Sequence, residues 1–277
     1  MWSPQIDQLI DLALEEDLGR GDLTSESIFA ADATCAGAIV AKQPGGMVLA
    51  GIEIAARVFR RVDPAIHVEV LVADGTHLPT RTPVLTVRGR TRAVLSAERT
   101  ALNFVQRASG IATATKRYVE LVAGTRAAIV DTRKTAPGYR LLDKAAVRAG
   151  GGRNHRADLA SGVLIKDNHV AACGGVRQAI ERARAYAPHT IKIECEVTTF
   201  AELDEALAAR ADIILLDNMT PDDVRRAVGV INGRALVEVS GGITHETVRA
   251  YAEAGPDLIS IGALTHSVKA ADLSLEV

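Results

Sequence analysis

Short apolar runs recur along the second half of the chain, and a helical pattern of small apolar residues follows each one. The runs lie at 128–130, 163–165, 191–197, 213–216, 235–239 and 258–261. After the first, successive runs begin about 20 to 30 residues apart, which is the length of a βα unit. The segments share no repeated template, so the spacing favours a β/α barrel over a solenoid. Roughly six units predict an incomplete, open barrel.

The first part of the chain has a different pattern. Residues up to about 18 predict a helix that ends at Gly19. A long helix is expected to open at Ser96 and to run towards Val122. We predict an α+β domain over residues 1–107 packed against an open β/α barrel over residues 108–277. Strand patterns lie at 38–41, 66–72 and 84–88, and a shorter helix is expected at 52–61.

Composition excludes several classes of protein. The 277 residues carry 32 Lys+Arg, 34 Asp+Glu and 3% aromatic residues, a balance that argues against general nucleic-acid binding. No run approaches about 18 uninterrupted apolar residues, and the N-terminus lacks the pattern of a signal peptide. Three cysteines without a C-x-x-C pair indicate a reducing compartment. We expect a cytoplasmic protein with no membrane or nucleic-acid partner.

Polar residues or glycines close almost every apolar run of the predicted barrel. Chemistry in a parallel barrel gathers at the carboxyl ends of the strands. One such group could be a solvated loop, but charges gathered in one mouth lose hydration and need compensation. Together they predict a functional site. The segments are DTRK at 131–134, KDNH at 166–169, ECE at 194–196, DN at 217–218, SGG at 240–242 and GA at 262–263.

The run at 191–197 is unusual because Lys192, Glu194 and Glu196 alternate onto one face of an otherwise apolar strand. Lys192 and Glu194 fit a salt-bridged layer inside the barrel as well as a functional role. Glu196 is nearest the mouth and is the better functional candidate. With Asp217 it forms an acidic pair suited either to Mg²⁺ or to acid and base catalysis, and the sequence leaves both roles open.

Positive charge is concentrated between residues 133 and 156, where seven Lys/Arg accompany one acid. Arg133 and Lys134 end a strand, and His155 and Arg156 follow a glycine loop. Guanidinium groups bind carboxylates and phosphates in a fork geometry, so this segment predicts binding of an anionic substrate. A solvated helix face is the favoured interpretation of three of the cations, Arg140, Lys144 and Arg148.

Two glycine segments suggest a phosphate site. Ser240, Gly241 and Gly242 follow a strand and precede a helix expected to begin near Thr244. Gly262 and Ala263 close the next strand, and late βα loops often bind phosphate in barrels. His266, four residues beyond Gly262, is near enough to contact that phosphate.

Motifs along the whole chain closely resemble the quinolinate phosphoribosyltransferase family. They are EEDLG (15–19), GDLT (21–24), ERTALN (98–103), DTRKT (131–135), GGRNHR (151–156), LIKDNH (164–169), ECE (194–196), LDN (216–218), EVSGGI (238–243) and IGALT (261–265). The resemblance implies transfer of phosphoribose from phosphoribosyl pyrophosphate to quinolinate, with loss of carbon dioxide and with Mg²⁺. It also implies an N-terminal α/β domain and an open barrel.

The resemblance also assigns roles to residues. Lys134, Lys166, Glu196 and Asp217 are the expected catalytic residues, and Glu196 and Asp217 would hold Mg²⁺ directly or through substrate and water. The match to Arg99 implies a homodimer or larger assembly in which this arginine reaches the partner's site. The expected quinolinate ligands are Arg133, His155, Arg156 and Lys166, and the phosphoribosyl pyrophosphate side comprises Lys134, Glu196, Asp217, Ser240, Gly241, Gly242 and Gly262. Thr132, Ala263 and His266 complete the expected substrate-binding set.

Three other hypotheses fit parts of the sequence. A related group associated with molybdate transport operons resembles the same family. Lys166 ends an apolar strand as the lysine of a Schiff-base aldolase does. Lys42 beside Pro44-Gly45-Gly46 suggests a lipoyl-like carrier, although no acidic residue of the carrier kind stands next to it.

Overall fold

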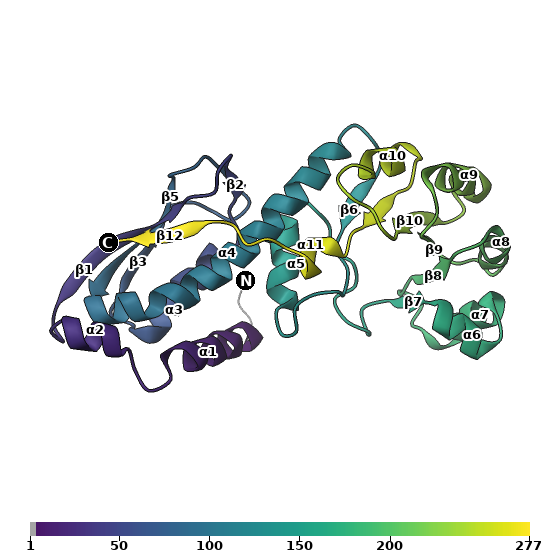
Figure 1. Ribbon diagram of the computed structural model, residues 1–277. Coiled ribbons are helices and arrows are strands. Elements are labelled where there is room, and N and C mark those ends of the chain that lie inside the picture. Colours follow the sequence, from purple (N-terminus) through teal and green to yellow (C-terminus); the bar gives the residue numbers. More distant parts are fainter. Residues whose placement is uncertain (1–3) are drawn as a thin grey trace. The chain divides into compact units, whose positions relative to one another are not determined.

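The computed structural model describes residues 4–277 as two compact units, each with its own main sheet (Figure 1). The first comprises residues up to 116 together with 136–151 and 267–277, and the second comprises 117–135 and 152–266. The predicted single boundary after residue 107 differs from this division. Two later segments of the chain return to the first unit, so no single cut separates the two.

The first unit contains a four-stranded antiparallel sheet in the order β12-β1-β5-β3. The C-terminal strand β12 pairs with β1, with Glu276 opposite Ala38. The elements are α1 (Pro4–Leu18), α2 (Leu23–Ile28), β1 (Thr34–Ala41), β2 (Met47–Val48), α3 (Ile52–Val62), β3 (His67–Val70), β4 (His77–Leu78), β5 (Pro83–Arg90), α4 (Thr91–Leu121), α5 (Arg140–Ala149) and β12 (Leu273–Glu276).

The apolar faces of α1, α3 and α4 meet this sheet in one core. Ile10, Phe59, Leu85 and Leu102 are all fully buried there. The first helix ends as predicted at Gly19, whose φ of 45° lies in the left-handed region that glycine tolerates. Residues 1–3 of that predicted helix lie outside the described residues.

Two local predictions were wrong. Helix α4 begins at Thr91 rather than Ser96, because the Ser96 hydroxyl donates to Oδ2 of Asp22 (2.9 Å) instead of capping the helix. Lys144 is buried on α5, so the face that it shares with Arg140 and Arg148 is not simply solvated.

The second unit contains a six-stranded parallel sheet in the order β6-β11-β10-β9-β8-β7. Its edge strands β6 and β7 do not pair, so among the described residues the sheet is the predicted open β/α barrel. The elements are β6 (Ala128–Val130), β7 (Val163–Ile165), α6 (Asp167–Cys173), α7 (Val176–Tyr186), β8 (Ile193–Val197), α8 (Phe200–Ala208), β9 (Ile213–Asp217), α9 (Pro221–Ile231), β10 (Leu236–Ser240), α10 (Val248–Glu253), β11 (Leu258–Ser260) and α11 (Ala263–His266).

Helix caps set where the barrel loops end. Thr199 and Glu202 form a capping box on α8, and Thr220 caps α9 ahead of Pro221. These caps start the two helices a few residues after β8 and β9. Because the strands of this sheet are parallel, their carboxyl ends lie at the same edge. Helices α7, α8 and α9 run outside the strands (Figure 1). Between residues 4 and 277 no helix is both long and apolar enough to cross a membrane.

Candidate active site

A cavity of about 860 Å³ opens at the carboxyl ends of the barrel strands. Every predicted binding residue except Arg99 lines it. Arg99 lies exposed on α4 of the first unit. The predicted residues at the cavity are Thr132, Arg133, Lys134, His155, Arg156, Lys166, Glu196, Asp217, Ser240, Gly241, Gly242, Gly262, Ala263 and His266.

Lys166, Glu196 and Asp217 form a charged group at the ends of β7, β8 and β9. The Lys166 ammonium donates to Oε2 of Glu196 over 2.7 Å. Burial and the charge of Glu196 raise the pKa of Asp217 above its ordinary value, while Lys166 opposes the rise. A Schiff-base lysine attacks a carbonyl with its nitrogen, whereas this nitrogen is held by the Glu196 carboxylate, so this geometry works against the aldolase hypothesis.

The backbone of Lys166 is held by its own helix. His169 accepts a hydrogen bond from the Lys166 backbone N–H at its Nδ1 (2.9 Å), and the residues between them open α6. This contact gives His169 a structural role beside the strand end.

Arg133 and Arg156 bring two guanidinium groups to the same wall of the cavity. Nη1 of Arg156 donates to the carbonyl of Gly162 (2.9 Å). Burial and the neighbouring charge of Arg133 lower the pKa of Arg156, and the charge of Glu194 opposes this effect. The two positive guanidinium groups lie close together and are partly shielded from water, so a ligand with two negative charges would neutralise both.

Asp131 fixes the segment that carries these cations. It is fully buried after β6 and accepts hydrogen bonds from Nδ2 of Asn154 (2.5 Å) and from the backbone N–H of His155 (2.9 Å). An isolated parallel bridge joins Val130 to Arg153. The 153–156 segment therefore runs beside β6 at the edge of the barrel sheet.

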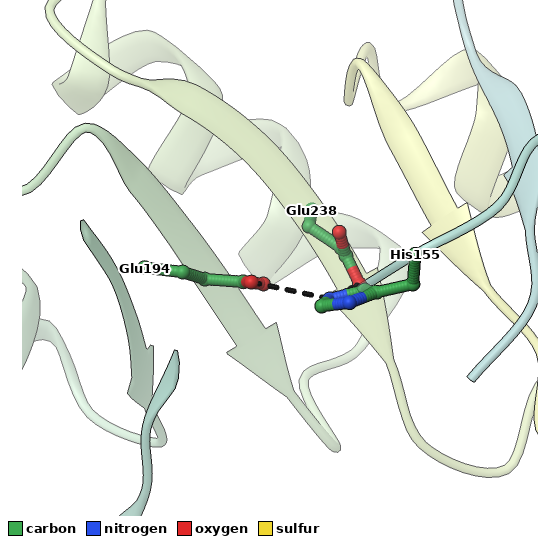
Figure 2. A group of neighbouring side chains, drawn as sticks. All are labelled: His155, Glu194 and Glu238. Carbon is green, nitrogen blue, oxygen red and sulfur yellow. Dashed lines mark ion pairs between the residues drawn. The ribbon is translucent and has the colours of Figure 1, made fainter. Parts of the chain in front are cut away.

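His155 uses both ring nitrogens within the protein. Its Nδ1 accepts the backbone N–H of Arg156 (2.7 Å). Its Nε2 lies 3.1 Å from Oε2 of Glu194 and 3.6 Å from Oε1 of Glu238 (Figure 2). His155 lines the cavity, where its role as a quinolinate ligand stays a prediction, and it also links two buried acids to the backbone of Arg156. Glu194 thus belongs to a layer inside the barrel, one of the two roles left open by the sequence.

The glycine segments line the cavity at the ends of β10 and β11. Gly241 has a φ of 100°, and a Cβ there would collide with Oδ1 of Asn218. A Cβ on Gly262 would lie 3.1 Å from Cδ of Lys134 and 3.2 Å from the His266 ring, so glycine lets these side chains approach. The predicted helix near Thr244 begins only at Val248, because the Thr247 hydroxyl first closes a turn with the Thr244 N–H.

Sequence reasoning missed several cavity residues, above all Glu238 and Ser260. Glu238 is two residues before Ser240 on β10, so it faces the same side of the sheet. Polar and apolar residues alternate on β10 as they do on β8, where the alternation pointed to Glu194 and Glu196. The same alternation could have identified Glu238 from the sequence.

The fold and this cavity define a class of protein. An open β/α barrel that gathers cations, carboxylates and glycine turns at its strand ends is a barrel enzyme for an anionic, phosphorylated substrate.

Comparisons with known proteins identify the family. The model described as the C-terminal domain of quinolinate phosphoribosyl transferase matches residues 111–276, and that of the N-terminal domain matches residues 22–109. A probable nicotinate-nucleotide pyrophosphorylase (carboxylating) of Bacillus subtilis is 44% identical over 273 residues, 99% of this chain and 93% of the relative. The nicotinate-nucleotide pyrophosphorylase (carboxylating) of Mycobacterium leprae is 45% identical, over 96% of this chain and 94% of the relative.

A solved structure agrees with these relatives. The nicotinate-nucleotide pyrophosphorylase from Francisella tularensis superposes with a TM-score of 0.94 at 38% identity, covering 99% of this chain and 97% of that chain. The chain belongs to the quinolinate phosphoribosyl transferase family, as its motifs predicted.

Proposed function

We propose that this protein transfers the phosphoribosyl group of phosphoribosyl pyrophosphate to quinolinate, with decarboxylation, in NAD biosynthesis. The products are nicotinate mononucleotide, pyrophosphate and carbon dioxide. The observation that carries the proposal is the convergence of Arg133, Arg156 and Lys166 on one cavity with Glu196 and Asp217. Two acids with three cations suit a dianionic acid beside a sugar diphosphate.

The cavity divides naturally between the two substrates. Arg133, Arg156 and Lys166 would bind the two carboxylates of quinolinate. Lys134 and His266 stand beside Gly262 and would contact phosphate oxygens. The backbone at Ser240, Gly241 and Gly242, together with Ala263 and Thr132, completes this second side.

The reaction needs charge stabilisation rather than a covalent nucleophile. The pyridine nitrogen bonds to C1′ of the ribose while the bond from C1′ to pyrophosphate breaks. Glu196 and Asp217 would stabilise positive charge on the sugar, and Lys134 the leaving pyrophosphate. The 2-carboxylate then departs as carbon dioxide, its bonding electrons remain on the ring beside the quaternary nitrogen, and the ring carbon takes up a proton.

The acidic pair also fits Mg²⁺, the expected cofactor. The charge of Glu196 contributes to the raised pKa of Asp217, so the two carboxylates lie close enough to repel each other. Two carboxylates with substrate phosphates and waters match the oxygen ligands of this hard cation. Glu196 and Asp217 would hold the ion directly or through water, and it would supply positive charge for the departing pyrophosphate.

We also propose a homodimer in which Arg99 completes the partner's site. Arg99 is exposed on α4, which supports a role at a surface between subunits. The described cysteines Cys35, Cys173 and Cys195 are all unpaired, which supports a reducing, cytoplasmic location.

The direct test is incubation with quinolinate, phosphoribosyl pyrophosphate and Mg²⁺. Pyrophosphate and carbon dioxide should appear in equal amounts, and neither should form without quinolinate. Arg133→Ala, which removes a cavity charge rather than core volume, should be folded by circular dichroism and nearly inactive. Failure of the folded wild-type protein to form either product would overturn the proposal.

A further inference from the structure

A layer of three side chains crosses the barrel interior below the active-site cavity. It consists of His155, Glu194 and Glu238, and the two glutamate side chains are only 5% and 2% exposed (Figure 2). Below this layer lies a second cavity of about 440 Å³, bordered by Val163 and Ile213, the first residues of β7 and β9. His155 and Glu238 line both cavities, so the layer separates them.

The hydrogen bonds assign the tautomer of His155. Its Nδ1 accepts the N–H of Arg156 and therefore carries no proton. The proton of the neutral ring is on Nε2, which faces the two carboxyl groups at 3.1 and 3.6 Å. The Nε2 side of the imidazole thus faces both acids, 3.1 Å from Glu194 and 3.6 Å from Glu238.

The same three residues have ligand types and spacing compatible with a metal ion, since their ligand atoms lie within 4.8 Å of one another. A metal would need the Nε2 lone pair and would move the proton to Nδ1, where it would meet the N–H of Arg156. The geometry therefore favours a proton-sharing cluster over a metal centre.

Glu238 is surrounded by groups of both signs. Burial, followed by the charge of Glu194, raises the pKa of Glu238 to about 7. Its neighbour His155 lowers that pKa, the hydroxyl of Ser260 on β11 lowers it less, and Asp131 adds further negative charge. The other ionisable side chains that line the two cavities are Arg133, Lys134, Arg153, Arg156, Lys166, Asp167, Lys192, Glu196, Asp217 and His266.

We propose that Glu238 is a positioning residue for the acid substrate: its neutral carboxyl keeps negative charge out of the cavity wall, and its ionisation weakens binding of quinolinate. This rests on the proposed function. Glu238 is buried in the lining of the cavity that holds Arg133 and Arg156, so its ionised carboxylate and the dianion would repel each other there. Quinolinate therefore binds preferentially to the protein with protonated Glu238, and binding near neutral pH takes up protons.

The test is calorimetry of quinolinate alone, without phosphoribosyl pyrophosphate, from about pH 6 to about pH 9. Over this range quinolinate stays a dianion. In the wild-type protein, Kd should rise about tenfold or more with pH. Buffers of different ionisation enthalpy should reveal net proton uptake. The isosteric E238Q variant, which keeps an acceptor for His155, should lose the proton uptake and the steep part of the pH dependence.

Ser260→Ala is the matched second variant. The Ser260 hydroxyl donates to the carbonyl of Val239 (3.4 Å) and lowers the pKa of Glu238, so its removal should move the rise in Kd to higher pH. This variant keeps the test decisive if E238Q does not fold.

Three results would overturn the proposal. One is the same pH profile in the wild type and E238Q, and another is a loss of affinity in E238Q that is equal at every pH, which marks a purely structural role. The third is a stoichiometric bound metal that E238Q loses. If the wild-type protein binds no quinolinate at any pH, the proposed function fails as well, so the two failures are distinguishable.

Discussion

Replacing Lys166 by methionine separates the function of the cavity from its stability. The Lys166 side chain is 47% exposed, and its partner Glu196 is 10% exposed. A half-exposed ion pair contributes little to folding, so the free energy of unfolding should fall by about 1 kcal/mol or less. A hydrogen bond to a charged partner contributes about 1.5–3 kcal/mol. Loss of such a bond to quinolinate should weaken binding by about tenfold to about 150-fold.

Calorimetry with quinolinate and urea denaturation measure these two quantities on the same samples. Lys192→Met is the matched control, because Lys192 precedes β8 of the same barrel yet does not line the active-site cavity. The control should bind quinolinate within about twofold of the wild type, since a screened charge outside the cavity contributes little. The reasoning is refuted if folded Lys166→Met binds normally, or if both variants lose affinity equally.

Three further predictions follow from other residues. Asp131→Ala should lower the free energy of unfolding by about 1.5–3 kcal/mol in urea denaturation, because the Asn154 amide and the His155 backbone N–H lose a buried acceptor; an unchanged midpoint would contradict this. Asp217→Asn should inactivate the enzyme but raise its Tm at neutral pH, because a raised pKa means that the ionised carboxylate destabilises the fold. The gain in Tm should shrink as the pH falls through that pKa. A gain in Tm that is the same at every pH would contradict this prediction. Mixing Arg99→Ala with Lys166→Met subunits should restore about a quarter of wild-type activity if Arg99 acts across a two-fold interface; no rescue would place it within its own subunit.

The barrel and its mouth could be predicted because their signals are local. Each short apolar run is a strand covered on both faces, and the residue that closes it lies at the common edge of a parallel sheet. The strand at 128–130 agrees with β6 without change, and the residues after it line the cavity. Periodicity and strand-end chemistry therefore located the site before any contact was known.

What the sequence did not reveal depends on long-range pairing. The partner of β12 is β1, more than two hundred residues away, and nothing in 273–276 specifies that register. Ser96 has the composition of a helix cap, but its hydroxyl finds Asp22 instead. Glu238 stands within a motif that was read for its glycines, so its contact with His155 emerged only from the structure.

Three ionisable groups that line the cavity have pKa shifts that favour their neutral forms. Arg156 is shifted downwards, and Asp217 and Glu238 are shifted upwards, so each is pushed towards its neutral form. An ion pair that holds the fold together shifts the pKa of its carboxyl the other way: the pKa of the buried Asp63 is lowered by Arg90. The cavity therefore holds charges that the protein alone compensates incompletely. A ligand that brings both negative carboxylates for the arginines and positive charge for the acids relieves both sides at once, which is what a dianionic acid beside a cationic ribosyl transition state provides.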